Sequence, residues 1–167
     1  RNMALGTSLI DMYAKCGMVR KAELMHRKLC VRDVVSWTAL IAGYAQQGQG
    51  YEALKCFEDM KIDGVSPNAI TLTFALKACG ACGDIDNGTK IHDEIANKKL
   101  LESDIVLATG LIDMYAKCGL FKKAQEVLQE IPIRNVVTWN ALIAGYARQE
   151  QGHKALNCFQ QMRAKGI

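Results

Sequence analysis

The sequence predicts an all-α protein of about five helix-turn-helix repeats, and the main reason is internal repetition. Residues 9–17, Leu-Ile-Asp-Met-Tyr-Ala-Lys-Cys-Gly, return letter for letter at 111–119, which is 102 residues later. Residues 39–50 return at 141–152 with two changes. Because 102 is three times 34, and helical-hairpin repeats are about 34 residues long, the duplicated block should contain three hairpins.

The clearest hairpin covers residues 34–68. We expect Ser36 to cap its first helix and Gly48 to end that helix. Apolar residues recur at helical spacing before this break (Leu40, Ile41, Tyr44, Ala45) and after it (Ala53, Leu54, Phe57, Met60). The second helix should end near Gly64, with Pro67 beyond it.

The same periodicity divides the whole chain into units of three lengths. The expected units are short 3–33, standard 34–68, long 69–104, short 105–135 and truncated standard 136–167. The first three units together account for the 102-residue repeat. We therefore expect one repeat array over residues 1–167, which reads as a segment of a longer protein.

Composition limits the classes of partner. Half of the residues are hydrophobic, 7% are aromatic and only two are proline, which suits stacked helices. No run approaches the roughly 18 apolar residues of a membrane helix, so no membrane is expected among the partners. The net charge of +4 permits a polyanionic partner without requiring one.

No catalytic or metal-binding set emerges from the sequence. Four of the seven cysteines recur at the 102-residue spacing, which is typical of small packing residues. Cys79 and Cys82 form a Cys-x-x-Cys pair, but no second pair completes a zinc site. The sequence His-Asp-Glu at His92 lacks the later Pro-Cys-x-x-Cys of a zinc deaminase. We expect no enzyme activity, no cofactor, no metal and no small-molecule substrate.

Several phrases resemble the pentatricopeptide repeat family. They are Val-Val-Ser-Trp-Thr-Ala-Leu-Ile-Ala-Gly-Tyr at 34–44, Glu-Ala-Leu-Lys-Cys-Phe-Glu-Asp-Met at 52–60, Leu-Lys-Ala-Cys at 76–79, Ile-His at 91–92, and the repeated Asp-Met-Tyr-Ala-Lys-Cys-Gly. The alternation of short, standard and long units is similar to the plant PLS subclass of this family. Tetratricopeptide repeats also span 34 residues, but they keep one length and carry a Trp-x-x-Leu-Gly pattern that is absent here.

The resemblance implies a right-handed superhelical solenoid that binds single-stranded RNA, with one base per repeat. It also implies that the fifth and last residues of each unit read the base. The pairs are Thr7 with Asp33, Thr38 with Asn68, Thr73 with Asp104, Thr109 with Asn135, and Asn140 with a partner beyond residue 167. The RNA element expected from these pairs is 5′-G-A-(G)-A-pyrimidine-3′, with the third letter in brackets because the long unit of this subclass often reads poorly.

Hydrogen-bond chemistry is consistent with that assignment. An ionised Asp only accepts hydrogen bonds, which suits the N–H donors of guanine or uracil, whereas Asn both donates and accepts and suits adenine or cytosine. By resemblance, Thr at the fifth place accompanies purines and Asn accompanies pyrimidines. The alternative is structural, because Thr, Asn and Asp near helix starts are favoured as caps and turn residues whatever the ligand.

Two further sets of residues follow from the resemblance. The second residues of the units should hold bases between them: Ala4, Val35, Ile70, Val106 and Val137. Cations late in the first helices should contact phosphates: Lys15, Lys117 and Arg148. Packing between repeats is the alternative for the first set, and solvated surface charge for the second. Trp37 and Trp139 are interpreted as packing residues and not as base-stacking platforms.

The resemblance further implies a role in plant organelles. Relatives of the PLS subclass specify sites for C-to-U editing or processing of chloroplast or mitochondrial transcripts, and some act with a protein cofactor of editing. The segment would then supply the address on the RNA. The alternative from another class is a helical scaffold that binds a protein or peptide in its groove.

Overall fold

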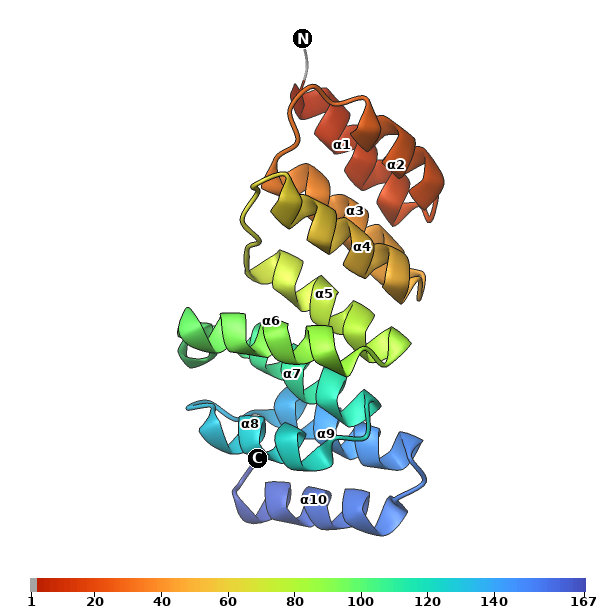
Figure 1. Ribbon diagram of the computed structural model, residues 1–167. Coiled ribbons are helices and arrows are strands. Elements are labelled where there is room, and N and C mark those ends of the chain that lie inside the picture. Colours follow the sequence, from red (N-terminus) through yellow and green to blue (C-terminus); the bar gives the residue numbers. More distant parts are fainter. Residues whose placement is uncertain (1–2) are drawn as a thin grey trace. The chain divides into compact units, whose positions relative to one another are not determined.

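The computed structural model describes residues 3–167 and is helical throughout that range, as predicted (Figure 1). The described residues form ten α-helices and one short 3₁₀ helix, without a strand. None of these helices is long and apolar enough to cross a membrane. Residues 1 and 2, which the predicted array includes, lie outside the described part. The chain divides into two compact units, Arg1–Cys82 and Gly83–Ile167, and each is described by itself.

The first unit is built from two helical hairpins and a fifth helix. Its helices are α1 (Met3–Lys15), α2 (Val19–Arg27), α3 (Val34–Gln46), α4 (Gly50–Ile62) and α5 (Ala69–Cys82). The first helices of the hairpins, α1 and α3, pack side by side, α5 packs on α3, and α2 and α4 also lie against α3. Ile10, Leu40, Tyr44 and Phe57 are buried in this arrangement. Apolar faces are thus covered by neighbouring hairpins, as in a repeat array.

The second unit follows the same plan. Its helices are α6 (Ile85–Asn97), η1 (Leu100–Glu102), α7 (Ile105–Lys117), α8 (Phe121–Glu130), α9 (Val136–Arg148) and α10 (Gly152–Ala164). Helix α7 packs on α8 and α9, α10 packs on α9, and α6 lies against α7. Leu107, Leu111, Ile112 and Tyr115 are fully buried at the centre of these contacts.

Helix starts coincide with the first residues of four predicted units, at Val34, Ala69, Ile105 and Val136. The division between the compact units falls between α5 and α6, inside the long unit 69–104. The partition into five units and the single array therefore stay predictions.

The predicted cap at Ser36 is wrong. Asp33 is the N-cap of α3, because its side chain accepts a hydrogen bond from Ser36 N at 2.8 Å while Asp33 N donates to Ser36 Oγ at 3.1 Å. This reciprocal pair is a capping box, in which Ser36 occupies the third helical position. The backbone of Asp33 is extended, so the helix begins three residues earlier than Ser36 would have placed it. The predicted break is confirmed, since α3 ends at Gln46 and Gly48 has a φ of +73°.

Candidate nucleic-acid interface

Two neighbouring hollows in the compact unit Arg1–Cys82 bring the sequence-predicted residues together. The first has a volume of about 350 Å³ and is lined by Thr7 and Asp33, the first predicted reading pair, with Ala4 and Val35. Ser8 and Asp11 complete its lining. Thr7 and Asp33 therefore face the same space as Ala4, the second residue of their own repeat, and Val35, the second residue of the next repeat.

The second hollow repeats this composition one unit further along. It also measures about 350 Å³ and is lined by Thr38 and Asn68 together with Val35 and Ile70. Lys15 lies in the same lining. Val35 belongs to both hollows, so one aliphatic side chain stands where two successive sites meet.

Four predicted base-holding residues share an unusual exposure for aliphatic side chains. The exposed fractions are 55% for Val35, 60% for Ile70, 59% for Val106 and 58% for Val137. The fifth member, Ala4, is exposed as well. Packing between hairpins would have buried these side chains, whereas each of the four is more than half exposed.

The last residues of the units have a structural role that the capping alternative anticipated. Each Oδ1 accepts from a backbone N–H in the first turn of the following helix. The bonds are Ser36 N to Asp33 at 2.8 Å, Thr71 N to Asn68 at 2.9 Å, Leu107 N to Asp104 at 3.1 Å and Thr138 N to Asn135 at 3.1 Å. Because the cap engages Oδ1 in every case, it also fixes the direction of the remaining atom, Oδ2 of Asp or Nδ2 of Asn.

The fifth residues differ in how their side chains are engaged. Thr7 Oγ1 is buried and has no hydrogen-bond partner in the described part of the chain. Thr38 Oγ1 lies 2.6 Å from Thr71 Oγ1. Thr73 and Thr109 donate to the carbonyl oxygens four residues earlier, at 2.9 and 2.7 Å. Asn140 is exposed. The pair Thr73 and Asp104 is divided between the two compact units, so the structure describes its members separately.

The three predicted phosphate-contacting cations are all paired with carboxylates that the sequence interpretation missed. Lys15 Nζ lies 2.7 Å from Asp11, and Lys117 Nζ and Arg148 Nη2 lie 2.6 and 3.0 Å from Asp113. Asp11 and Asp113 are the same letter of the repeated nine-residue phrase, four residues before each lysine. That i, i+4 spacing was a readable signal for the two lysine pairs.

The tryptophans are core residues, as predicted. Trp37 and Trp139 are 5% and 3% exposed. His26 packs edge-on against Trp37, with 4.2 Å between the ring centroids. His92 Nδ1 lies 2.9 Å from the hydroxyl oxygen of buried Tyr115.

His26 should make the stability of the fold depend on pH. Burial and the nearby charge of Arg32 lower the pKa of His26 from 6.5 to about 4. Between pH 6.5 and about pH 4, His26 binds a proton in the unfolded chain but not in the folded chain. The free energy of unfolding therefore falls as the pH is lowered through this range. Replacing His26→Leu should therefore reduce the loss of stability between pH 7.5 and 4.5 by about 1–3 kcal/mol.

Denaturant unfolding at both pH values measures this effect. Equal pH dependence in the wild type and in the His26→Leu variant would contradict the assignment of a neutral buried imidazole.

Within residues 3–167, no group of three or more His, Cys, Asp and Glu side chains is placed to hold a metal ion. Cys16, Cys30, Cys56, Cys82 and Cys158 are free thiols. Cys82 Sγ donates to the carbonyl oxygen of Ala78 at 3.1 Å, inside helix α5.

Comparison with known proteins identifies the repeats. The sequence profile of the PPR repeat family matches residues 32–81 and 134–167, and that of the PPR repeat matches residues 7–34 and 106–136. A pentatricopeptide repeat-containing protein of Arabidopsis thaliana is 40% identical over 166 residues, 99% of this chain and 20% of that protein. A chloroplastic protein of the same description is 40% identical over 167 residues, covering 100% of this chain and 27% of its own.

A third Arabidopsis thaliana relative, named mitochondrial, is 40% identical over 159 residues, 95% of this chain and 25% of the relative. The chain thus spans a fifth to about a quarter of the length of these three relatives.

Solved structures show the same fold. The pentatricopeptide repeat protein PPR10 from maize matches with a TM-score of 0.78 at 23% identity, over 100% of this chain and 25% of that one. The same protein in complex with an 18-nucleotide psaJ RNA element matches with a TM-score of 0.81 at 24% identity, over 99% and 26%. The predicted all-helical solenoid class is confirmed. Because the profile of the PPR repeat family matches half of its residues, this chain belongs to the pentatricopeptide repeat family.

Proposed function

We propose that this segment binds single-stranded RNA and reads one base in each unit. Two successive hollows in the compact unit Arg1–Cys82 carry the proposal. Each hollow is lined by one predicted base-reading pair and by two aliphatic side chains. A base in either hollow would lie between Val35 and the second residue of the adjoining unit, with its edge towards the polar pair. The fold shared with the RNA-bound maize protein supports this assignment.

The capping hydrogen bonds determine which side-chain atom of each last residue is left to contact a base. Asp33 holds a backbone N–H with Oδ1 and keeps Oδ2 as an acceptor, which suits the N1–H of guanine. Asn68 holds its N–H with Oδ1 and keeps Nδ2 as a donor, which suits N1 of adenine. The same reasoning gives guanine for the long unit and adenine for Asn135. With a pyrimidine at Asn140, the proposed element is 5′-G-A-(G)-A-pyrimidine-3′.

The phosphate contacts are proposed at Lys15, Lys117 and Arg148. Asp113 neutralises one of the two cations beside it, so this pair of cations offers a single net positive charge. Binding should weaken as salt rises, because each phosphate contact releases counterions.

We propose further that the array belongs to the PLS subclass and specifies an editing or processing site on a chloroplast or mitochondrial transcript, with an editing cofactor protein as a second partner. The unit lengths and relatives named chloroplastic and mitochondrial support this proposal. The segment would act as the recognition module and carry out no catalytic step.

A matched pair of alanine substitutions tests RNA binding at the hollows. Val35→Ala should weaken the affinity for single-stranded RNA about 3- to 10-fold, because Val35 lines both hollows and aliphatic stacking contributes less than aromatic stacking. Ile62→Ala removes an even more exposed aliphatic side chain from α4, outside both hollows, and should leave the affinity unchanged. Fluorescence anisotropy measures both. Equal effects would contradict the assigned interface and favour the protein-scaffold alternative.

A further inference from the structure

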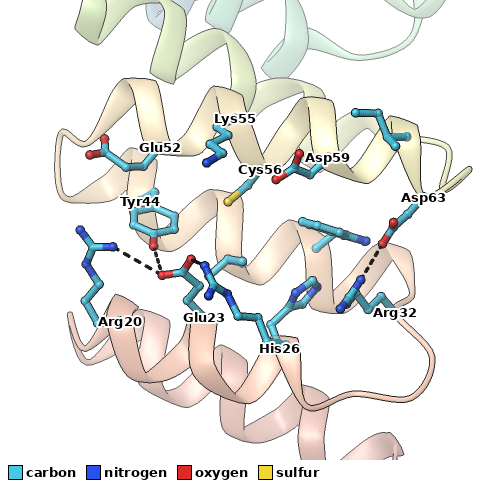
Figure 2. Close-up of a pocket in the computed structure, with 14 residues that line it drawn as sticks. Arg20, Glu23, His26, Arg32, Tyr44, Glu52, Lys55, Cys56, Asp59 and Asp63 are labelled. Atoms are coloured by element: carbon cyan, nitrogen blue, oxygen red, sulfur yellow. Dashed lines mark hydrogen bonds and ion pairs between the residues drawn. The ribbon is translucent and has the colours of Figure 1, made fainter.

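A separate polar cavity lies among α2, α3 and α4 of the first unit (Figure 2). Its volume is about 390 Å³, within the usual range of ligand pockets. None of its lining residues lines either of the two hollows proposed for RNA. Both proposed RNA hollows are lined mainly by α1, α3 and α5, whereas this cavity is lined mainly by the second helices of the hairpins.

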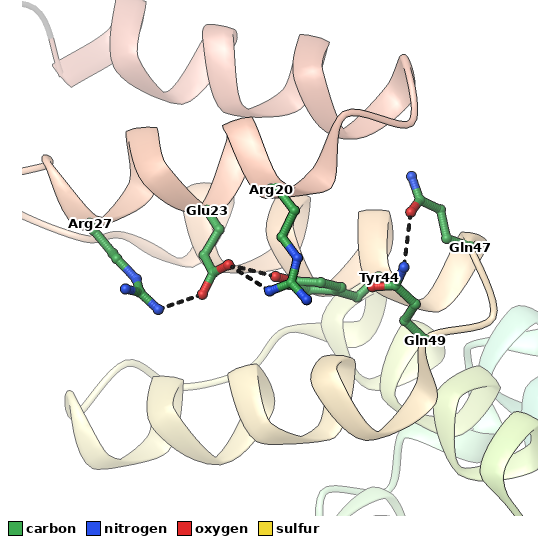
Figure 3. Close-up of polar contacts among 6 residues, drawn as sticks. All are labelled: Arg20, Glu23, Arg27, Tyr44, Gln47 and Gln49. Atoms are coloured by element: carbon green, nitrogen blue, oxygen red, sulfur yellow. Dashed lines mark hydrogen bonds and ion pairs between the residues drawn. The ribbon is translucent and has the colours of Figure 1, made fainter.

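Charged side chains fix the two ends of the cavity. At one end, Glu23 accepts from the Tyr44 hydroxyl at 2.8 Å and from Arg27 at 2.7 Å, with Arg20 at 3.5 Å (Figure 3). At the other end, Arg32 Nη1 donates to Asp63 at 3.1 Å and so joins the segment before α3 to the end of α4.

Three polar atoms of the lining are buried and have no partner within the described residues: His26 Nε2, Arg32 Nε and Trp37 Nε1. The side chains of His26 and Trp37 belong to residues only 2% and 5% exposed. Figure 2 shows the His26 ring next to the Arg32 guanidinium. Buried polar groups are nearly always hydrogen-bonded, so this cluster calls for an occupant that supplies the missing partners.

The duplicated block provides a comparison within the same chain. Leu128 stands where the first copy has His26, and Lys165 stands where it has Asp63. Arg134, the counterpart of Arg32, uses its Nε to donate to the Leu128 carbonyl oxygen at 2.7 Å. Arg32 Nε makes no such bond within the described residues, and its Nη1 donates to Asp63. Trp139 Nε1 is also unpartnered, so the histidine and the arginine, and not the indole, distinguish the first copy.

Helices α2 and α4 expose apolar side chains at three positions where the second copy has polar or small residues. Leu24, Tyr51 and Ile62 are 58%, 71% and 81% exposed. The corresponding residues of the second copy are Glu126, His153 and Ala164. Of these three residues, Ile62 lines the cavity, whereas Leu24 and Tyr51 lie elsewhere on α2 and α4. Exposed apolar residues on helices that border a polar cavity are typical of surfaces that contact another protein.

The balance of charge selects the chemistry of the occupant. Four cationic and four carboxylate side chains line the cavity, so neither an anion nor a cation is favoured by net charge. Arg32 Nε and Trp37 Nε1 are donors that require an acceptor, and a neutral imidazole offers one ring nitrogen as an acceptor. An amide group brings an acceptor oxygen and a donor N–H together in one neutral group.

We propose that this cavity is a docking site for a protein partner, which inserts a carboxamide side chain or a backbone amide against His26 and Arg32 and rests on the exposed apolar side chains of α2 and α4. The proposal is independent of RNA binding. A partner bound there would leave both RNA hollows uncovered.

Nuclear magnetic resonance tests the amide chemistry directly, because the chain has two tryptophans and therefore two indole N–H signals. Titration with N-methylacetamide should give a saturable shift of the Trp37 signal and none of the Trp139 signal, whereas acetate and ethylammonium should shift neither. The combined replacement of His26→Leu and Asp63→Lys installs the residues of the second copy and should abolish the shift. Equal responses of both signals, or none, would show a cavity that holds only water.

A random peptide library displayed on phage tests the protein source. Peptides selected on the wild-type chain should contain Asn or Gln, and should bind at least about tenfold more weakly to the His26 and Asp63 double variant. They should weaken similarly on a variant that carries Leu24→Glu, Tyr51→His and Ile62→Ala. Peptides indifferent to both variants would overturn the proposal. An amide response without selected peptides would overturn the protein partner and leave a small-amide site.

Discussion

Replacing Thr38→Asn together with Asn68→Asp should change the base preference of the repeat 34–68 from adenine to uracil. Asn68→Asp replaces the donor Nδ2 of the last residue by the acceptor Oδ2. Thr38→Asn replaces the fifth residue expected with purines by the one expected with pyrimidines. Each good base contact provides about 1–3 kcal/mol of discrimination, by analogy with major-groove pairs. Titration against RNAs that differ only at the second nucleotide of the element should show the preference reverse.

The fold should tolerate this double variant, because the chain already uses both residue types at the equivalent places. Asn140 stands at the counterpart of Thr38, and Asp33 and Asp104 cap helices as Asn68 does. The control is Thr109→Asn with Asn135→Asp, which should move the preference at the fourth nucleotide and leave the second unaffected. A preference that stays with adenine at the second nucleotide would refute the assigned register.

Replacing Gly145→Val should lower the free energy of unfolding of the compact unit Gly83–Ile167 by about 3 kcal/mol. A Cβ at Gly145 would meet the Cβ of Ala116 well inside van der Waals contact, and Phe121 lies 3.4 Å away. Ala116 is buried on α7 and Phe121 is half-buried at the start of α8, so α7 and α9 would have to separate. Thermal or denaturant unfolding measures the change.

The matched control is Gly152→Val, at a glycine whose Cβ would meet nothing within 4 Å. That substitution should change the free energy of unfolding by no more than about 0.5 kcal/mol. Similar losses at the two positions would mean that α7 and α9 do not approach as closely as described.

Much of the helical fold was predictable because the sequence repeats it. Residues 9–17 and 111–119 form the ends of α1 and α7, and the periodicity around Gly48 located the turn between α3 and α4. The cap was harder to place. Asp33 and Ser36 are both good capping residues, and only the extended backbone at Asp33 determines which one takes that role.

The candidate site was predictable in part. The spacing of Val35, Thr38 and Asn68 came from the repeat register, but their meeting in one hollow depends on how α1, α3 and α5 pack. The pairing of Arg148 with Asp113 joins residues of different helices, so no local spacing indicates it. The cavity at His26 was unpredictable for the same reason, because it is formed by side chains of three helices.

The central claim is that the array reads RNA in the assigned register, and one titration tests it most directly. The chain is mixed with fluorescent single-stranded RNA that contains GAGAU or GAGAC, and with an equal-length control in which adenines and guanines are exchanged, at near-physiological salt and at higher salt. We expect tighter binding to the predicted element, with an affinity that falls as salt rises. Equal affinity for both RNAs, or no binding to either, would contradict the account.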